Sequence, residues 1–217
     1  METTTQQYGA VFDLDGVLID TEGTYSEFWS SIDEMYPTGI ENFAAVIKGT
    51  TLTEILNHFS TEEIRADIKQ RIHDFEETMV YELMPDVNRF IGELRDAGFP
   101  IAIYTSSDHV KMAHLKRQQP ELLDAVDVII TGSDVSCSKP NPEGYLKAAE
   151  AIGRRPVEFF VFEDSLQGLE AGRRSGATVI GLATTLPAER LSGKAHLIVD
   201  NLASLTVDTL FALVSKL

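Results

Sequence analysis

Cysteine and basic side chains are scarce in this sequence, and each scarcity excludes a class of protein. Cys137 is the one cysteine among 217 residues, so neither an internal disulfide nor a metal cluster built from cysteines can form. Lysine and arginine total 18 against 34 acidic residues, which gives a formal charge of −16. A field of that sign repels nucleic acids and anionic membranes, so we expect neither as a partner.

Long hydrophobic runs are also missing from the sequence. No stretch approaches the roughly 18 apolar residues of a membrane-spanning helix. Residues 1–7 have neither the basic nor the apolar segment of a signal peptide. We therefore expect neither membrane insertion nor export. The reducing cytoplasm is the compartment that fits a chain with so little cysteine.

What the sequence does contain begins with a short apolar strand that runs into two carboxylates. Residues 8–12 are apolar throughout, which is typical of a central strand in a parallel sheet. Asp13 and Asp15 follow, and Gly16 allows a sharp turn. The pair is compatible with an ordinary turn at the end of a strand. In a partly dry site, however, two such carboxylates repel each other unless a divalent cation neutralises them or one holds a proton.

Residues 20–84 have the apolar periodicity of three or four helices, with apolar side chains recurring at steps of three and four. Thr51 and Glu54 are spaced as a capping box, in which each side chain bonds the backbone N–H of the other at the start of a helix. A segment this long and apolar is not a loop. We therefore expect a small helical domain inserted into a core made of residues 1–19 and 85–217.

From residue 85 onward, predicted strands and helices alternate. The strands cover residues 100–104, 126–130, 159–162, 178–182 and 196–199, and a closing helix is expected over residues 202–215. This alternation is the signature of a parallel sheet with helices on its faces. The predicted fold class is α/β, with a Rossmann-like parallel sheet as the core and an inserted α-helical domain.

Four polar clusters lie at or after strands that run in the same direction. They are Asp13 with Asp15, Thr105 with Ser106, Lys139, and Glu163 with Asp164. Because the carboxyl ends of parallel strands meet at one edge of the sheet, we expect these side chains to lie together. The set contains what phosphoryl transfer needs, namely a nucleophile, oxygen ligands for a hard cation, donors for the phosphate oxygens and a fixed positive charge.

Several of these side chains have a definite role in such chemistry. Asp13 is the expected nucleophile, and its attack on phosphorus gives an aspartyl phosphate. Asp13, Asp164 and the carbonyl of Asp15 suit Mg²⁺, which takes a few carboxylates together with waters and substrate oxygens. Lys139 provides a compact point charge. The hydroxyl of Thr105 and nearby backbone N–H groups would hold the phosphate.

The same residues resemble the motifs of the haloacid dehalogenase-like superfamily, and within it the beta-phosphoglucomutase-like branch of phosphatases and phosphomutases. The first motif matches residues 12–17, the second 104–106, the third 139–140, and the fourth 161–165 with Gly168. The four motifs occur in the right order, and the resemblance covers nearly the whole chain.

The resemblance implies a role for each matching residue. Asp13 is the nucleophile and Asp15 the general acid and base. The resemblance gives phosphate binding to Thr105, Ser106 and Lys139. It gives metal binding to Asp13, Asp15, Glu163 and Asp164, with Mg²⁺ as the cofactor. The helical insert resembles the family's cap, which closes over the site.

Asp15 favours phosphate esters as substrates, because a leaving alkoxide needs a proton and a positioned acid contributes about 10²–10⁴-fold in rate. The dehalogenases and phosphonate hydrolases of the superfamily lack an Asp at this position. We expect a Mg²⁺-dependent phosphatase that acts on a small phosphorylated metabolite, a sugar phosphate. A non-enzymatic phospho-acceptor domain is less favoured, since such modules are about half as long and have no helical insert.

A phosphomutase is the main alternative. The beta-phosphoglucomutase branch has a cap-entry His where this chain aligns Tyr25, and a cap-loop Arg where it aligns Leu52. Both departures remove polar groups tied to mutase action, although Lys48 could replace the arginine. Tyr25 and Trp29 lie on an apolar stripe, so they are expected to pack in the core of the insert rather than to contact substrate.

Overall fold

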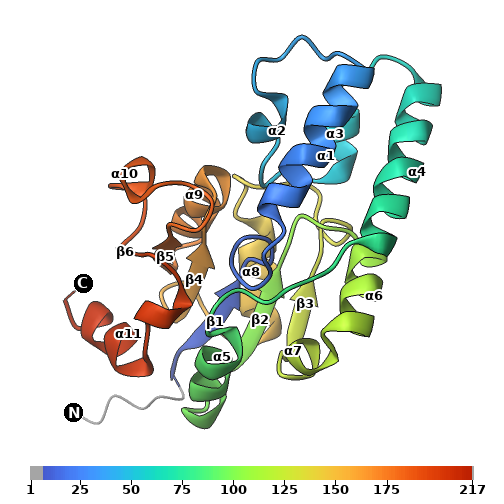
Figure 1. Cartoon of the computed structure of the whole chain (residues 1–217). Coiled ribbons are helices and arrows are strands. Elements are labelled where there is room, and N and C mark those ends of the chain that lie inside the picture. Colours follow the sequence, from blue (N-terminus) through green and yellow to red (C-terminus); the bar gives the residue numbers. More distant parts are fainter. Residues whose placement is uncertain (1–6, 217) are drawn as a thin grey trace.

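The computed structural model describes residues 7–216, and a single sheet runs through its centre (Figure 1). The strands are β1 (Gly9–Phe12), β2 (Ile101–Tyr104), β3 (Val128–Ile130), β4 (Phe159–Glu163), β5 (Thr178–Leu182) and β6 (Leu197–Val199). They pair in parallel in the order β3-β2-β1-β4-β5-β6. The strand order reverses at β1, which lies between β2 and β4. The predicted Rossmann-like α/β fold is therefore confirmed.

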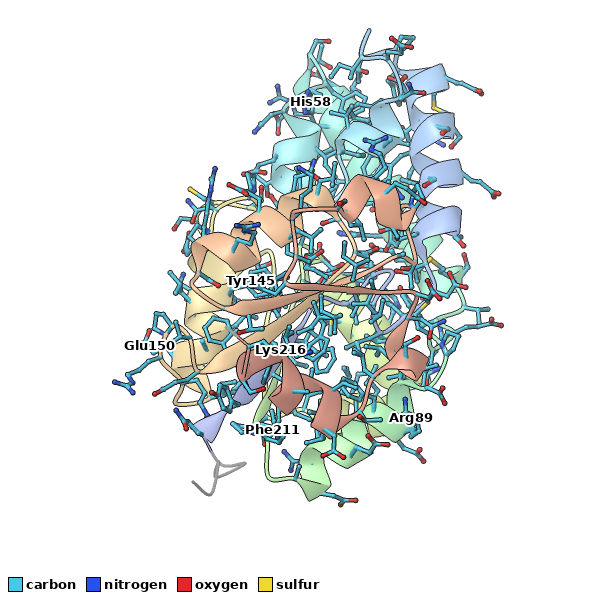
Figure 2. The ribbon with its side chains drawn as sticks, turned by 90° about the vertical axis from the view of Figure 1, so that its left-hand side faces the viewer. His58, Arg89, Tyr145, Glu150, Phe211 and Lys216 are labelled. Carbon is cyan, nitrogen blue, oxygen red and sulfur yellow. The ribbon has the colours of Figure 1, made fainter. Side chains whose placement is uncertain are left out.

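Helices cover both faces of the sheet. They are α5 (Val87–Asp96), α6 (His109–Gln118), α7 (Pro120–Asp124), α8 (Glu143–Ala151), α9 (Leu166–Arg174), α10 (Ala188–Leu191) and α11 (Val207–Val214). In β1, Ala10 and Phe12 pack with α5, α6, α7 and α11, whereas Val11 packs with α8, α9 and α10. Both sides of the strand are buried, which is why its sequence is apolar throughout. Figure 2 shows the same division on α8, where Tyr145 points inward and Glu150 points to solvent.

Four further helices form the insert between β1 and α5. They are α1 (Glu22–Met35), α2 (Phe43–Val46), α3 (Leu52–Leu56) and α4 (Glu62–Thr78). Their apolar side chains form a cluster separate from the two clusters at the sheet: Trp29, Ile32, Phe43, Ile47, Ile55, Phe59, Ile68 and Ile72. The insert stands over the carboxyl ends of the strands (Figure 1), so the cavity below it is lined by both parts of the chain.

The two segments that connect the insert to the core run side by side. The Asp20 N–H donates to the Glu82 carbonyl at 2.9 Å, and the Met84 N–H donates to the Leu18 carbonyl at 3.0 Å. Ile19 and Leu83 form an antiparallel bridge between these bonds. The chain thus leaves and re-enters the core at one place, close to the end of β1.

The end of the chain differs from the single helix predicted over residues 202–215. A 3₁₀ turn, η2 (Leu202–Ser204), and an extended Leu205 come before α11. The Thr206 hydroxyl accepts the Thr209 N–H at 3.3 Å, and the Thr209 hydroxyl accepts the Thr206 N–H at 3.0 Å. This capping box starts a new helix inside an apolar pattern that is otherwise continuous. The short helices α7 and α10 are additions to the predicted elements, because four or five residues carry little periodicity.

No helix within residues 7–216 is long and apolar enough to cross a bilayer.

Candidate active site

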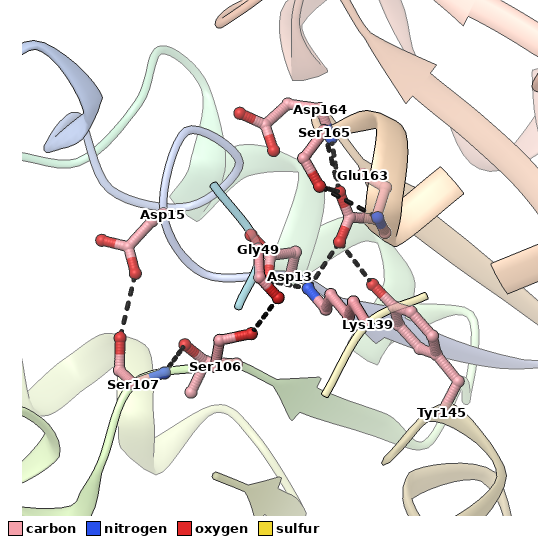
Figure 3. A network of polar contacts seen from close by, with 12 residues as sticks. Asp13, Asp15, Gly49, Ser106, Ser107, Lys139, Tyr145, Glu163, Asp164 and Ser165 are labelled. Atoms are coloured by element: carbon pink, nitrogen blue, oxygen red, sulfur yellow. Dashed lines mark hydrogen bonds and ion pairs between the residues drawn. The ribbon is translucent and has the colours of Figure 1, made fainter. Parts of the chain in front are cut away.

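The residues singled out in the sequence meet at the carboxyl edge of the sheet (Figure 3). Asp13 follows β1, Thr105 follows β2, and Asp164 follows β4. The loop after β3 brings Lys139 to the same place. All four side chains are buried, as is that of Glu163 at the end of β4. Ionisable groups are rarely buried without partners, so their hydrogen bonds and charges define what the site can do.

Lys139 joins two carboxylates at the centre of the site. Its Nζ donates to Asp13 Oδ1 and to Glu163 Oε1. Burial alone would lower the pKa of Lys139, but the charges of Asp13 and Glu163 raise it above the usual value for a lysine. The ammonium group is therefore charged, and it lies against the carboxylate that is the predicted nucleophile.

Glu163 uses both oxygens to hold this arrangement. Its Oε1 accepts from the Tyr145 hydroxyl at 2.8 Å as well as from Lys139. Its Oε2 accepts from the Asp164 N–H, the Ser165 N–H and the Ser165 hydroxyl, each at 3.0 Å. A carboxylate with this many donors is fixed in position. Its geometry favours a supporting role beneath Lys139 and Asp164.

Asp13, Glu163 and Asp164 bring carboxylate oxygens within 4.8 Å of one another, a spacing that suits a metal ion. Burial raises the pKa of Asp13 to about 8 even though Lys139 opposes the shift, and burial with the neighbouring carboxylates raises that of Asp164 well above its usual range. Burial thus disfavours the ionised form of both groups, and for Asp164 the neighbouring carboxylates add to that effect. A hard cation with oxygen ligands, such as Mg²⁺, fits that donor set.

The Asp15 side chain points away from this acidic cluster (Figure 3). It accepts hydrogen bonds from Thr21, from Lys111 and, at 3.1 Å, from the Ser107 hydroxyl. Burial opposes ionisation, but the charge and hydrogen bond of Lys111 together with the two hydroxyls lower the Asp15 pKa below its usual value. Because the Asp15 carboxylate is engaged by these donors, the backbone carbonyl is the group of Asp15 that is available to the predicted metal site.

Lys111 is a charged residue of the site that the sequence interpretation missed. It lies in the first turn of α6, its side chain is almost completely buried, and its Nζ also lies 4.3 Å from the centre of the Tyr25 ring. The sequence does indicate that Lys111 is buried, because it lies with Met112 and Leu115 on the apolar side of the predicted helix. A lysine on the buried face of a helix needs a carboxylate partner, and Asp15 supplies it.

The segment after β2 contacts the insert as well as the core. Thr105 Oγ1 accepts the Ser107 N–H at 3.0 Å, and the Ser106 hydroxyl donates to the Gly49 carbonyl at 2.7 Å (Figure 3). Thr105 lines the same cavity as Asp13 and Asp164, and the Ser106 hydroxyl bonds the loop of the insert. Their predicted roles as phosphate binders stay predictions.

A cavity of about 120 Å³ lies between the polar centre and the insert. Asp13, Asp15 and Asp164 form its floor, and Tyr25 and Trp29 belong to its wall. The expectation that the two aromatic residues only pack in the core of the insert is thus too narrow. Trp29 is buried in the cluster of the insert and also lines the cavity.

The fold and this site define an α/β enzyme with an acidic centre and two buried lysines, Lys111 and Lys139, at the edge of a parallel sheet. The family model of the haloacid dehalogenase-like hydrolases matches residues 9–176. The chain belongs to that family, as its motifs predict.

Named relatives and solved structures share most of the chain's length. Hexitol phosphatase A of Escherichia coli is 30% identical over 204 residues, which covers 92% of this chain and 93% of that protein. The phosphorylated carbohydrates phosphatase of Thermotoga maritima is 28% identical over 203 residues, covering 90% and 88%. The crystal structure of beta-phosphoglucomutase from Clostridium difficile has a TM-score of 0.80 at 19% identity, covering 96% and 97%, which shows a shared fold.

Proposed function

We propose that this protein is a Mg²⁺-dependent phosphatase that hydrolyses a small phosphorylated sugar or polyol through an aspartyl phosphate. The observation that carries the proposal is the placement of Asp13. It is buried against Lys139, its oxygens lie near those of Asp164, and Asp15 follows two residues later. The two relatives named as phosphatases of hexitols and of phosphorylated carbohydrates support the same class of substrate.

In the first step, an Asp13 oxygen attacks phosphorus and the bond to the leaving oxygen breaks. Asp15 gives its proton to that oxygen, so the product leaves as an alcohol. In the second step, Asp15 takes a proton from water as the water attacks the aspartyl phosphate, which releases phosphate and restores Asp13. Lys139 and Thr105 would hold the phosphoryl oxygens in place.

The charge on Asp15 fits both steps. Lys111 and the two hydroxyls stabilise the ionised form, which is the form that the second step needs. A substrate phosphate placed beside Asp15 adds negative charge, which raises the Asp15 pKa and favours the protonated form for the first step. Mg²⁺, held by Asp13 and Asp164 with the Asp15 carbonyl, would neutralise the phosphate and the carboxylates around it.

The cavity wall argues against the mutase alternative. A mutase must bind a sugar with phosphate at both ends, and this requires cations far from the nucleophile. Lys48, the candidate replacement for the mutase arginine, forms an ion pair with Glu22. Leu52 lines the cavity, and the Tyr25 hydroxyl donates to Glu76 at 2.7 Å. These contacts provide no uncommitted cation for a second phosphate.

Replacing the proposed nucleophile tests the proposal. Asp13→Asn is nearly isosteric but cannot attack phosphorus, so we expect hydrolysis of sorbitol 6-phosphate and of p-nitrophenyl phosphate to fall by at least about 10³-fold. Phosphate release with added Mg²⁺ is the measurement, and circular dichroism checks that the variant is folded. Steady-state turnover within about tenfold of wild type would rule out the covalent mechanism.

The mutase alternative has its own test. The wild-type protein is incubated with beta-glucose 1-phosphate and a trace of the 1,6-bisphosphate, and both inorganic phosphate and glucose 6-phosphate are followed. A phosphatase releases phosphate without isomerising the sugar. Rapid formation of glucose 6-phosphate with little free phosphate would instead identify a mutase.

A further inference from the structure

The cavity between the insert and the core is lined by two basic residues, and each of them forms an ion pair. Lys48 of the insert is paired with Glu22, and Lys111 of α6 is paired with Asp15. These two are the basic residues among the side chains that line the cavity. Each is partly or almost completely buried beside its partner, so their charges are already balanced before a substrate arrives.

Carboxylates outnumber these cations. Besides Asp15 and Glu22, the wall includes Glu76 of α4 and Asp108 at the start of α6. Asp108 Oδ1 accepts the N–H groups of the first turn of α6, Val110 at 2.9 Å and Lys111 at 3.1 Å. Glu76 is 6% exposed, and its carboxylate accepts a hydrogen bond from the Tyr25 hydroxyl, a neutral donor. The wall around the leaving group is therefore net acidic.

The wall also contains apolar side chains, beside hydroxyl groups such as those of Ser26 and Thr50. Trp29, Ile47, Leu52, Ile55 and Ile72 contribute to it. The C–H faces of a sugar or polyol can pack against such side chains, and its hydroxyls can donate to the Glu76 carboxylate. A carboxylate or a second phosphate placed there would lose its hydration without gaining an unpaired cation as a partner. It would also be repelled by the carboxylates of the wall.

We propose that the leaving group of the substrate is a polyhydroxylated group that carries no anion of its own, and that Glu76 rejects substrates with a second phosphate or a carboxylate. This inference rests on the proposed phosphatase function and narrows its substrate class. It predicts that the chain prefers an alditol phosphate to the aldonate phosphate of the same length.

Two matched pairs of substrates test the inference on the wild-type protein. Sorbitol 6-phosphate is compared with 6-phosphogluconate, and glycerol 3-phosphate with 3-phosphoglycerate; in each pair a CH₂OH group is replaced by a carboxylate. Burial raises the pKa of Glu76 to about 7, so the assay is run with Mg²⁺ at about pH 8, above that pKa, where Glu76 is mostly ionised. We expect kcat/KM to favour the alcohol by at least about tenfold in the better pair. Equal values in both pairs, or a preference for the acids, would overturn the inference.

Replacing Glu76 tests whether this residue causes the preference for the alcohol. Glu76→Gln keeps the shape of the side chain and removes its charge, so we expect the preference for the alcohol to fall at least about threefold. The matched control is Glu77→Gln, which changes the same charge at an exposed neighbouring position of α4 and should keep the wild-type ratio. A Glu76→Gln ratio equal to that of the control would show that Glu76 does not select the substrate. If Glu76→Gln fails to fold, the wild-type comparison still decides whether anions are rejected.

Hydrolysis of p-nitrophenyl phosphate separates this inference from the function on which it rests. If the wild-type protein hydrolyses the aryl ester but does not discriminate within the pairs, the inference fails and the phosphatase stands. If no phosphate ester is hydrolysed in the presence of Mg²⁺, the proposed function fails, and the inference fails with it.

Discussion

Glu163 depends on a glycine in the first turn of the next helix. Gly168 lies in α9, and a Cβ built on it would come within 1.7 Å of Glu163 Oε1. The Gly168 N–H also donates to the Ser165 hydroxyl at 3.0 Å, and that hydroxyl in turn donates to Glu163. The absence of a side chain at this one position thus leaves room for the carboxylate that holds Lys139.

Gly168→Ala should therefore disturb the site directly. The methyl group must displace the Glu163 carboxylate from its donors, and we expect a loss of roughly 2–4 kcal/mol in unfolding free energy and at least about tenfold in kcat. The matched control is Gly92→Ala in α5, where a Cβ meets nothing within 4 Å. That change should be neutral or should stabilise the protein by up to about 1 kcal/mol. Urea denaturation and phosphate release measure both variants, and normal activity in Gly168→Ala would contradict this account of Glu163.

Among the elements, α3 joins the insert to the loop that carries Lys139. The Thr51 hydroxyl accepts the Glu54 N–H at 3.4 Å, as predicted for the first half of a capping box. The second half is not formed. The Glu54 carboxylate instead accepts the Ser138 N–H at 3.3 Å and the Ser138 hydroxyl. The prediction of a reciprocal capping box was wrong because a donor from the core competes for the same carboxylate.

We predict that Glu54→Gln weakens the seating of the insert over the active site. The amide keeps the size of the side chain but loses the charge-assisted bonds to Ser138, which are stronger than neutral ones. We expect kcat/KM for sorbitol 6-phosphate to fall by about three- to tenfold, with a smaller loss in unfolding free energy, of about 1 kcal/mol. Glu62→Gln, at an exposed position in the first turn of α4, is the control and should leave kinetics unchanged. Equal kinetics in the two variants would show that the Glu54 contact does not affect catalysis.

At the scale of the whole molecule, acidic residues outnumber basic ones, and several of the acidic residues lie together in the site. The formal charge is −16, and three carboxylates share one buried cluster. The pKa of Asp13 is raised from 3.8 to about 8, so the folded protein without a cation holds a proton that the unfolded chain releases. The contribution of Asp13 to stability is present below about pH 4 and is lost as the pH rises through 8. A bound cation removes this loss by compensating the charge.

Stability should accordingly depend on Mg²⁺ and pH together. After treatment with EDTA, we expect activity to disappear and the Tm to decline between pH 5.5 and 8, as carboxylates in the cluster are forced to ionise. Saturating Mg²⁺, at about a hundred times its Kd, contributes about 2.7 kcal/mol and should raise the Tm by roughly 5–10 °C near pH 8. The rise should be smaller near pH 5.5, where protons compete with the cation. Differential scanning fluorimetry measures these shifts; full activity in metal-free buffer, or a Tm that Mg²⁺ does not change at either pH, would count against the metal site.

The sequence by itself determined the sheet, its helices and the residues that approach its carboxyl edge. Continuous apolar strands can only be buried on both faces, and parallel strands place Asp13, Thr105 and Asp164 at the same edge whatever the loops do. The motif order also gave the family, which the match over residues 9–176 shows. These features depend on local patterns, and local patterns can be read along the chain.

Only the tertiary structure decided which partner each of the other polar groups takes. Lys111 meets Asp15 across 96 positions of sequence, Tyr25 meets Glu76 across 51, and Glu54 turns to Ser138 across 84. No spacing rule relates residues so far apart, because several partners compete for each carboxylate and the packing of the insert on the core selects among them. The charge of the cavity wall, and with it the proposed choice of substrate, therefore follows from the folded arrangement of the insert and the core.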